Sequence, residues 1–399
     1  MFSGRPTWYS LIGLLALLLF VPPAPACPFC PSAQQTLLGE LNQAHLIVFG
    51  TLTNAQRDPN EFGKGTTDME IEVVVKDHEF LKGKKKITLP RYVPPDPKNK
   101  SKHLVFCEIY KGELDPYRGE AVPPDSKIAE YLKGAIELKD KDMPTRLQYF
   151  FKNFDSPDWA ISGDAYQEFS NAEYKDVRVA AAKMDPDHVL KMLKDPNTSI
   201  ARYGLLGLVL GHCGKAETHG KALREFLDDP KVKQATGLDG LLAGVILLDP
   251  KGGLEYLAGL IKDSKEDFTV RYAALRCMRF FWEYREDTIK KATIVEAILP
   301  LLDQPDIVDL AVEDLRKWER WELASKLVGL FAEPSHDIPI VQRSIIKFAL
   351  SAPATDKKCA EFIERLKADP KQAERIRDLQ ELLELEKPRP EPKKETPKK

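Results

Sequence analysis

The sequence predicts a two-part fold in which a small all-β barrel is followed by an all-α solenoid. Residues 27–140 contain short runs in which apolar and polar residues alternate, the period of strands with one buried face. Residues 145–386 repeat an apolar helix end, an Asp and usually a Pro at intervals of roughly 30 to 40 residues, the period of helical-hairpin repeats. The chain therefore divides into four segments, 1–26, 27–140, 145–386 and 387–399.

The first segment has the features of a signal peptide. Arg5 supplies a positive charge, an uncharged apolar run spans 11–21, and Ala24-Pro25-Ala26 forms a small-residue cleavage site. The apolar run is shorter than the roughly 20 residues of a membrane span. We expect cleavage after Ala26 and export to the periplasm, the cell envelope or the extracellular space. Cys27 would then be the first mature residue, so a lipid anchor at Cys27 is an alternative.

The charge of the chain gives no reason to expect a nucleic-acid partner. The formal net charge is -2 for 399 residues, and a nearly neutral chain produces no long-range field that attracts a polyanion. The tail at 387–399 alternates Pro, Lys and Glu and has too few apolar residues to bury, so we expect it to be disordered.

The second segment contains several predicted strands. Alternating or β-branched runs lie at His45–Leu52, Met69–Val75, Lys86–Leu89 and Leu104–Tyr110, and glycine and proline punctuate the loops between them. About five short strands within about 100 residues are typical of a small barrel or sandwich.

A family resemblance rests on four short runs at Ala44–Gly50, Glu70–Lys76, Leu81–Gly83 and Ile87–Leu89. Together they are similar to exported bacterial domains of the netrin-like, tissue-inhibitor-of-metalloproteinase type. The resemblance implies an OB-like barrel whose first mature residue, here Cys27, is tied to it by disulfides. In the inhibitors of that type, the amine and carbonyl of this cysteine chelate a protease zinc. Metalloproteinase inhibition through Cys27 is therefore an alternative function, although the family pattern is Cys-x-Cys and this chain has Cys-Pro-Phe-Cys.

Three cysteines in this segment have several interpretations. We expect a structural disulfide that joins Cys107 to Cys27 or Cys30, because export implies an oxidising compartment. A redox site is an alternative, but no strand precedes Cys27 once the signal is removed. A metal site formed by Cys27, Cys30 and Cys107 lacks motif spacing. The other cysteines stand singly in apolar helical patterns and are expected to be buried: Cys213, Cys277 and Cys359.

The third segment contains the repeats. The four clearest junctions are Leu193–Pro196, Leu227–Pro230, Ile261–Ser264 and Leu302–Pro305. Proline cannot continue a helix but suits the first turn of the next one, and a neighbouring Asp can cap that helix. Arg202-Tyr203-Gly204-Leu205-Leu206 also aligns with Arg271-Tyr272-Ala273-Ala274-Leu275, an arrangement that resembles HEAT and related repeats. The resemblance implies a HEAT-type α-solenoid, although Asp309 and Gln342 stand where the arginine is expected.

Seven side chains are candidates for binding a partner on the solenoid surface. One interpretation is structural: the arginines would bond between neighbouring repeats, and the aromatic residues would pack in the core. The sharper interpretation places them in a binding groove, because Trp and Tyr are favoured at the centres of interfaces. The candidates are Arg202, Tyr203, Arg271, Tyr272, Trp282, Trp318 and Trp321. We expect Trp318 and Trp321, three residues apart, to share one helix face.

No catalytic motif is visible. HExxH, GxSxG and nucleotide-binding glycine signatures are missing from the sequence, and Gly211–Lys215 lacks the spacing of a phosphate loop. We expect a non-enzymatic scaffold without metal or cofactor that binds an unidentified protein or peptide. The alternatives are the metalloproteinase-inhibitor-like protein and a thiol or metal-binding protein.

Overall fold

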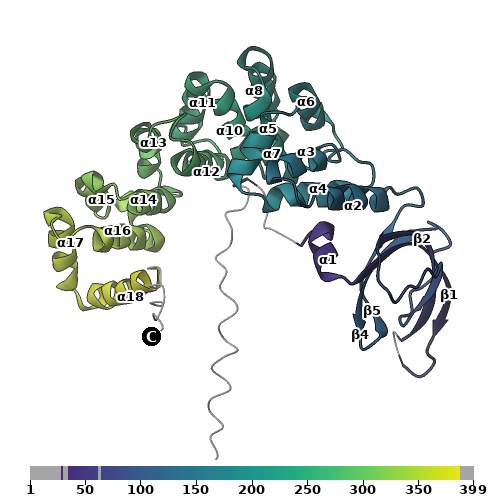
Figure 1. Ribbon diagram of the computed structural model, residues 1–399. Coiled ribbons are helices and arrows are strands. Elements are labelled where there is room, and N and C mark those ends of the chain that lie inside the picture. Colours follow the sequence, from purple (N-terminus) through teal and green to yellow (C-terminus); the bar gives the residue numbers. More distant parts are fainter. Residues whose placement is uncertain (1–27, 30–34, 62–63, 387–399) are drawn as a thin grey trace, which may run out of the picture. The chain divides into compact units, whose positions relative to one another are not determined.

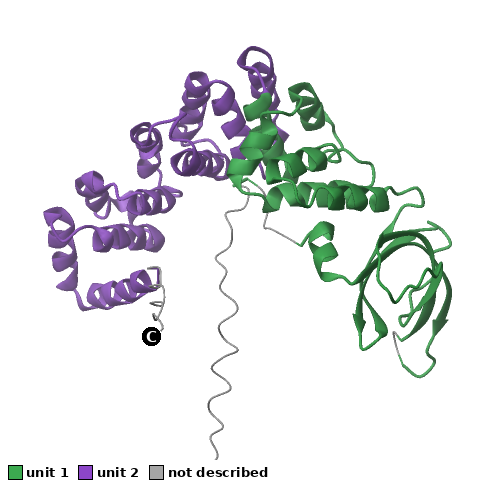
Figure 2. Cartoon of the chain, in the orientation of Figure 1, with its two compact units in different colours: residues 1–213 green, residues 214–399 purple. Residues whose placement is uncertain are grey.

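The computed structural model describes residues 28–29, 35–61 and 64–386. The expected signal peptide, Cys27, Cys30 and the 387–399 tail lie outside these residues. The chain forms two compact units, residues 1–213 and 214–399, which are coloured separately in Figure 2. Unit 1 holds a sheet and helices, and unit 2 is helical (Figure 1). The predicted order of a β region followed by an α region is confirmed.

The sheet of unit 1 is antiparallel and has five strands in the order β3-β2-β1-β4-β5. Among the described residues no hydrogen-bonded pairing joins the edge strands β3 and β5, so the sheet is not closed. Helix α1 precedes it. The bounds are α1 Leu37–Gln43, β1 Leu46–Arg57, β2 Gly65–Lys76, β3 Lys86–Leu89, β4 Lys102–Tyr110 and β5 Glu113–Val122.

One face of the sheet carries its apolar core. Alternate residues of β1 and β4, such as Val48 and its partner Val105, point to this face because the side-chain period of a strand is two. Gly50 lets β1 approach β2, since a Cβ added there would lie 1.9 Å from the carbonyl oxygen of Glu70. The core residues are Leu46, Val48, Met69, Leu81, Ile87, Leu89, Val105, Cys107 and Leu114.

Helices α2 to α7 complete unit 1. Asp185 shows how the Asp-Pro signal begins a helix: its carboxylate accepts a hydrogen bond from the N–H of Asp187, and Pro186 is the first residue of α6. The bounds are α2 Ile128–Glu137, α3 Met143–Phe151, α4 Trp159–Asn171, α5 Tyr174–Ala181, α6 Pro186–Lys194, η1 Ile200–Arg202 and α7 Tyr203–Cys213.

From α10 onward, the helices of unit 2 lie in two rows (Figure 1). The first, here called the inner row, contains α10, α12, α14, α16 and α18, and the second contains α11, α13, α15 and α17. The bounds are η2 Ala216–Gly220, α8 Lys221–Leu227, α9 Pro230–Lys233, α10 Leu238–Leu248, α11 Pro250–Lys262, α12 Phe268–Tyr284, α13 Lys291–Ile298, η3 Leu299–Asp303, α14 Val308–Lys317, η4 Trp321–Leu323, α15 Ala324–Leu330, η5 Pro334–His336, α16 Pro339–Ser351, α17 Lys357–Lys367 and α18 Pro370–Glu386.

The predicted junctions behave in two ways. Asp229 caps α9, whose first residue is Pro230, as the sequence suggests. Pro196 and Pro305 instead lie in turns, and the next α-helix starts several residues later. Asp195 explains the first of these cases, because its carboxylate accepts from the N–H of Asn197 and closes a local turn.

Candidate functional site

The inner row presents a stripe of aromatic and basic side chains along α12. Phe268, Tyr272, Arg276, Arg279 and Trp282 follow one another at spacings of three or four residues, so they share one helix face. The Phe268 and Tyr272 rings stack with centroids 5.9 Å apart. Both arginines lie over the Tyr272 ring, at 5.8 Å and 5.7 Å from its centroid. We call these five residues the α12 stripe.

The stripe ends in a pair of stacked tryptophans. The rings of Trp282 and Trp318 have centroids 4.2 Å apart and are nearly parallel, at 13°. Lys291 lies 4.9 Å and Arg320 lies 5.5 Å from the centroid of the Trp282 ring. Trp318 is buried and Trp282 is half-buried. Stacking and two cations together hold the Trp282 ring in one orientation.

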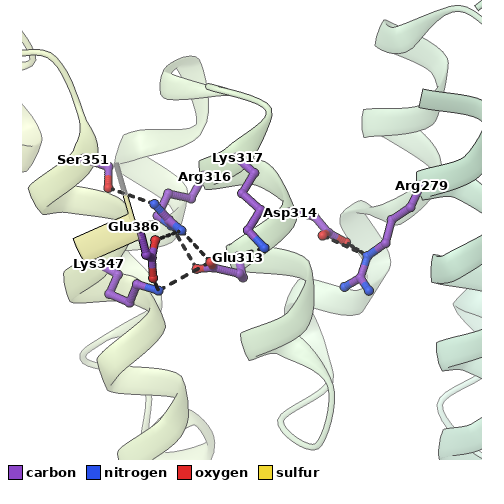
Figure 3. A network of polar contacts seen from close by, with 8 residues as sticks. All are labelled: Arg279, Glu313, Asp314, Arg316, Lys317, Lys347, Ser351 and Glu386. Carbon is purple, nitrogen blue, oxygen red and sulfur yellow. Dashed lines mark hydrogen bonds and ion pairs between the residues drawn. The ribbon is translucent and has the colours of Figure 1, made fainter. Parts of the chain in front are cut away.

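Ion pairs join neighbouring helices of the inner row. Asp239 of α10 pairs with Arg276 of α12. Arg279 of α12 donates from Nε to both carboxylate oxygens of Asp314 in α14, at 2.9 Å and 2.7 Å (Figure 3). Burial raises the pKa of Asp314, and the charge and hydrogen bond of Arg279 oppose that rise. Burial likewise raises the pKa of Asp239 against the charge of Arg276. Each arginine thus compensates a buried carboxylate on the next helix.

A cluster of five residues, here called the C-terminal cluster, extends the pattern across α14, α16 and α18 (Figure 3). Arg316 donates to both oxygens of Glu313, at 2.9 Å and 2.5 Å, and to Ser351 at 3.4 Å. Glu386 bridges two cations, with Oε2 2.7 Å from Arg316 and Oε1 2.7 Å from the Nζ of Lys347. Lys347 also donates to Glu313 at 3.4 Å. One guanidinium and one ammonium group therefore share two carboxylates.

The cluster keeps its acidic members ionised. Burial by itself would raise the pKa of Glu313, but the hydrogen bond and charge of Arg316 and the charge of Lys347 lower it below its usual value. Burial also acts to raise the pKa of Glu386, and the hydrogen bond from Lys347 and the charge of Arg316 outweigh it. The hydrogen bond to Glu313 raises the pKa of Arg316.

A cavity of about 860 Å³ adjoins the C-terminal cluster. Its wall combines charged groups with the apolar side chains of Leu350 and Leu383. The lining residues are Glu313, Arg316, Lys317, Leu350, Ser351, Gln380, Leu383, Glu384 and Glu386.

Arg202 and Arg271, which align in the sequence, both donate hydrogen bonds to groups within the protein. In unit 1, Arg202 donates to the carbonyl oxygens of Phe154 at 2.7 Å and Ser162 at 3.0 Å. Burial lowers its pKa. These contacts match the interpretation of Arg202 as a strut. Tyr203 beside it begins α7 and is half-buried.

In unit 2, Arg271 is buried, with a side chain only 4% exposed. It donates to the carbonyl oxygen of Glu266 at 2.9 Å, to Oε1 of Gln304 at 2.6 Å, and to both oxygens of Asp306 at 3.0 Å and 2.6 Å. Gln304 in turn donates to the carbonyl oxygen of Ile261. Arg271 therefore serves as a strut to the segment that precedes α14, whereas its neighbour Tyr272 belongs to the α12 stripe.

Trp318 and Trp321 do not share a helix face. Helix α14 ends at Lys317, and Glu319 has φ 58°, so the chain turns between the two tryptophans. Trp318 stacks on Trp282, whereas Trp321 packs against Phe348 of α16 with centroids 5.1 Å apart. The expectation of one shared face was wrong because it continued the helical spacing through a left-handed residue.

Cys107 is a free thiol in this structure, fully buried in the core of the sheet. Its expected partners, Cys27 and Cys30, lie outside the described residues, within which no disulfide forms. Burial raises the pKa of the Cys107 thiol to about 12, which is the opposite of an activated redox cysteine. Cys277 and Cys359 are buried as expected, and Cys213 is half-buried.

The described part of the chain contains neither a metal-ligand cluster nor a membrane-spanning helix. Among those residues, no group of three or more His, Cys, Asp or Glu side chains is arranged to hold a metal ion. No helix in the same ranges has both the length and the apolar character of a membrane span.

A second buried polar site ties α1 to the helices of unit 1. The carboxylate of Asp164 in α4 accepts the N–H of Leu37 at 2.5 Å and the hydroxyl of Tyr131 at 2.8 Å. Burial raises the pKa of Asp164 to about 7. Glu168, one turn further along α4, also has a pKa raised by burial, against a hydrogen bond from Thr36. Neither carboxylate was a candidate from the sequence.

The sequence did contain a signal for the ion pairs of the inner row. Arg279 and Asp314 are separated by 35 residues, as are Arg271 and Asp306. This separation equals about one repeat, so opposite charges one repeat apart indicate contacts between stacked helices.

No known protein family, curated protein or solved structure matches this chain.

Proposed function

We propose that this chain is an exported, non-enzymatic scaffold that binds a protein or peptide on the inner row of unit 2. In this proposal the helices form a HEAT-type solenoid and the open five-stranded sheet is a partly open, OB-like barrel. The two rows of helices and the ion pairs at intervals of 35 residues support the repeat architecture. Stacked repeats expose a continuous surface suited to an extended partner.

The observation that carries the proposal is the stacked pair Trp282 and Trp318 with its two cations. Tryptophan and arginine are enriched among the residues that dominate binding energy, and aromatic rings held in place lose little entropy on association. The Trp282 ring is half-buried and already oriented by its contacts, at 4.2 Å from Trp318 and 4.9 Å from Lys291. A peptide offers apolar side chains to the Trp282 ring and polar groups to the neighbouring cations, so it suits this surface.

The rest of the α12 stripe adds a mixed aromatic and basic surface next to Trp282. Phe268 is partly exposed, and Tyr272 lies beneath two guanidinium groups. Because Arg279 is paired with Asp314, its charge is already compensated and the stripe does not present a bare polycationic patch. The same pairing favours binding over proton-transfer chemistry, since it holds the carboxylate as an ion-pair partner.

The test is partner capture from the native host by the immobilised protein, followed by an affinity measurement on each captured protein. Trp282→Ala should lower the affinity for a true partner by at least about 30-fold, the loss typical of a hot-spot residue. The matched control is Trp159→Ala in α4 of unit 1, a tryptophan that is 63% exposed. Thermal melting checks that both variants fold. A partner bound equally well by folded Trp282→Ala and wild type contradicts the proposal.

A further inference from the structure

We propose that the C-terminal cluster is a recognition site for an acidic side chain of the partner, and that Glu386 occupies this site in the structure. The inference rests on the proposed scaffold function and names the chemistry of one partner segment, a peptide rich in Glu or Asp. In this proposal the Glu386 carboxylate competes with the acidic side chain of the ligand for the same two cations.

Without Glu386, the C-terminal cluster has a surplus of positive charge. Arg316 and Lys347 have side chains only 11% and 12% exposed, and Lys317 lies 3.7 Å from Glu313. Glu313 then pairs with all three cations, of which Arg316 and Lys347 are the two withdrawn from water, since the side chain of Lys317 is 63% exposed. Ions withdrawn from water need a counter-charge in good geometry, so this site calls for a second carboxylate.

Glu386 occupies an exchangeable position. It is the last residue of α18, and its side chain is 38% exposed. The buried residues of α18, Ile376 and Leu379, lie more than a turn away toward its N-terminus, and Leu385 beside Glu386 is exposed. Helix ends with few buried contacts open at low free energy, so the carboxylate can leave while α18 stays packed.

A carboxylate fits this site better than a phosphate does. Glu386 satisfies the site with one oxygen on each cation, both at 2.7 Å. Glu313 already pairs with Arg316, and Glu384 also lines the cavity. These two carboxylates would repel the second charge of a phosphate group. The adjoining cavity of about 860 Å³, with Leu350 and Leu383 in its wall, gives room for the residues that flank the bound acid.

The test measures binding of a fluorescein-labelled hexaglutamate peptide to the full chain by fluorescence anisotropy. If Glu386 fills the site in about nine of ten molecules, its removal tightens apparent binding about tenfold. Glu386→Gln should therefore bind about tenfold more tightly than wild type. Glu381→Gln is the matched control, since it makes the same charge change at an exposed position of α18.

The site itself is tested by adding a second change to Glu386→Gln. Arg316→Gln should abolish the gain, and Lys347→Gln should reduce it while leaving the Arg316–Glu313 pair in place, which guards against misfolding of the first variant. Equal affinities of Glu386→Gln and Glu381→Gln would overturn the inference. So would undiminished binding by the Lys347→Gln double variant, or tighter binding of a phosphoserine peptide than of hexaglutamate.

The two proposals fail separately. If partner capture depends on Trp282 but the affinity for hexaglutamate is the same with and without Glu386, the scaffold proposal is supported and the proposed acidic-side-chain site is wrong. If hexaglutamate responds as expected while no captured partner depends on Trp282, the site stands and the proposed binding face is wrong.

Discussion

Two glycines in α11 provide a matched test of how closely the helices of unit 2 pack. A Cβ added to Gly253 would lie 2.7 Å from the Cα and 2.9 Å from the backbone nitrogen of Ile246 in α10. A Cβ added to Gly259, two turns later in the same helix, would meet nothing within 4 Å. Alanine at the two positions therefore differs chiefly in its contact with α10.

The expected magnitudes follow from these distances. Replacing an exposed helical glycine by alanine stabilises a helix by about 1 kcal/mol, so Gly259→Ala should raise the free energy of unfolding by up to that amount. At Gly253 the overlap is with backbone atoms, which no rotamer change relieves. Overpacking costs about 1–3 kcal/mol, which exceeds the gain in helix propensity. Gly253→Ala should therefore lower the free energy of unfolding by up to about 2 kcal/mol.

The assay is urea denaturation of wild type and both variants, followed by far-UV circular dichroism. Opposite shifts of the midpoint with an unchanged slope are expected, because the slope reports the surface exposed on unfolding. If Gly253→Ala proved as stable as Gly259→Ala, the close approach of α10 and α11 would be refuted, and with it the two-row packing of unit 2.

Three further outcomes follow from buried charges. Burial raises the pKa of Asp164 to about 7 from its ordinary 3.8. Its contribution to the free energy of unfolding is therefore full below about pH 4 and is lost as the pH rises toward 7. Asp164→Asn keeps an acceptor for the N–H of Leu37 and should remove this loss, which melting at pH 5 and pH 8 will show. Arg271→Ala leaves Gln304 Oε1 buried without its donor and should cost about 1–3 kcal/mol in chemical denaturation. The pKa of Glu313 is lowered in the fold, so its stabilisation holds above its ordinary 4.5 and is lost on acidification; Glu313→Gln should show a smaller decline in melting temperature below pH 4.5.

The sequence predicted those parts of the fold that depend on local patterns. Alternation located β1, β2, β3 and β4, because the side-chain period of a strand is visible within a few residues. The strand β5 (Glu113–Val122) escaped notice because Pro116 and Gly119 interrupt its pattern. Asp-Pro junctions located the start of α9 but not that of α7, where the Asp195 turn delays the next helix.

The candidate site was only partly predictable, because its contacts join residues one repeat apart. Trp282 and Trp318 were both candidates, but their stacking follows from the packing of the inner row and no local pattern encodes it. The buried state of Arg271 likewise depends on Gln304, which another repeat contributes. Asp164 was not a candidate, because its contact with the N–H of Leu37 joins α4 to α1, 127 residues apart in the chain, and no local pattern encodes it.

The most direct test of the scaffold proposal is the affinity of a captured partner for wild type, Trp282→Ala and Trp159→Ala, measured by isothermal titration on folded proteins. The proposal predicts a loss of at least about 30-fold for Trp282→Ala alone, with Trp159→Ala equal to wild type. Equal affinities for all three proteins would contradict it, because the oriented Trp282 ring would then make no contribution to binding.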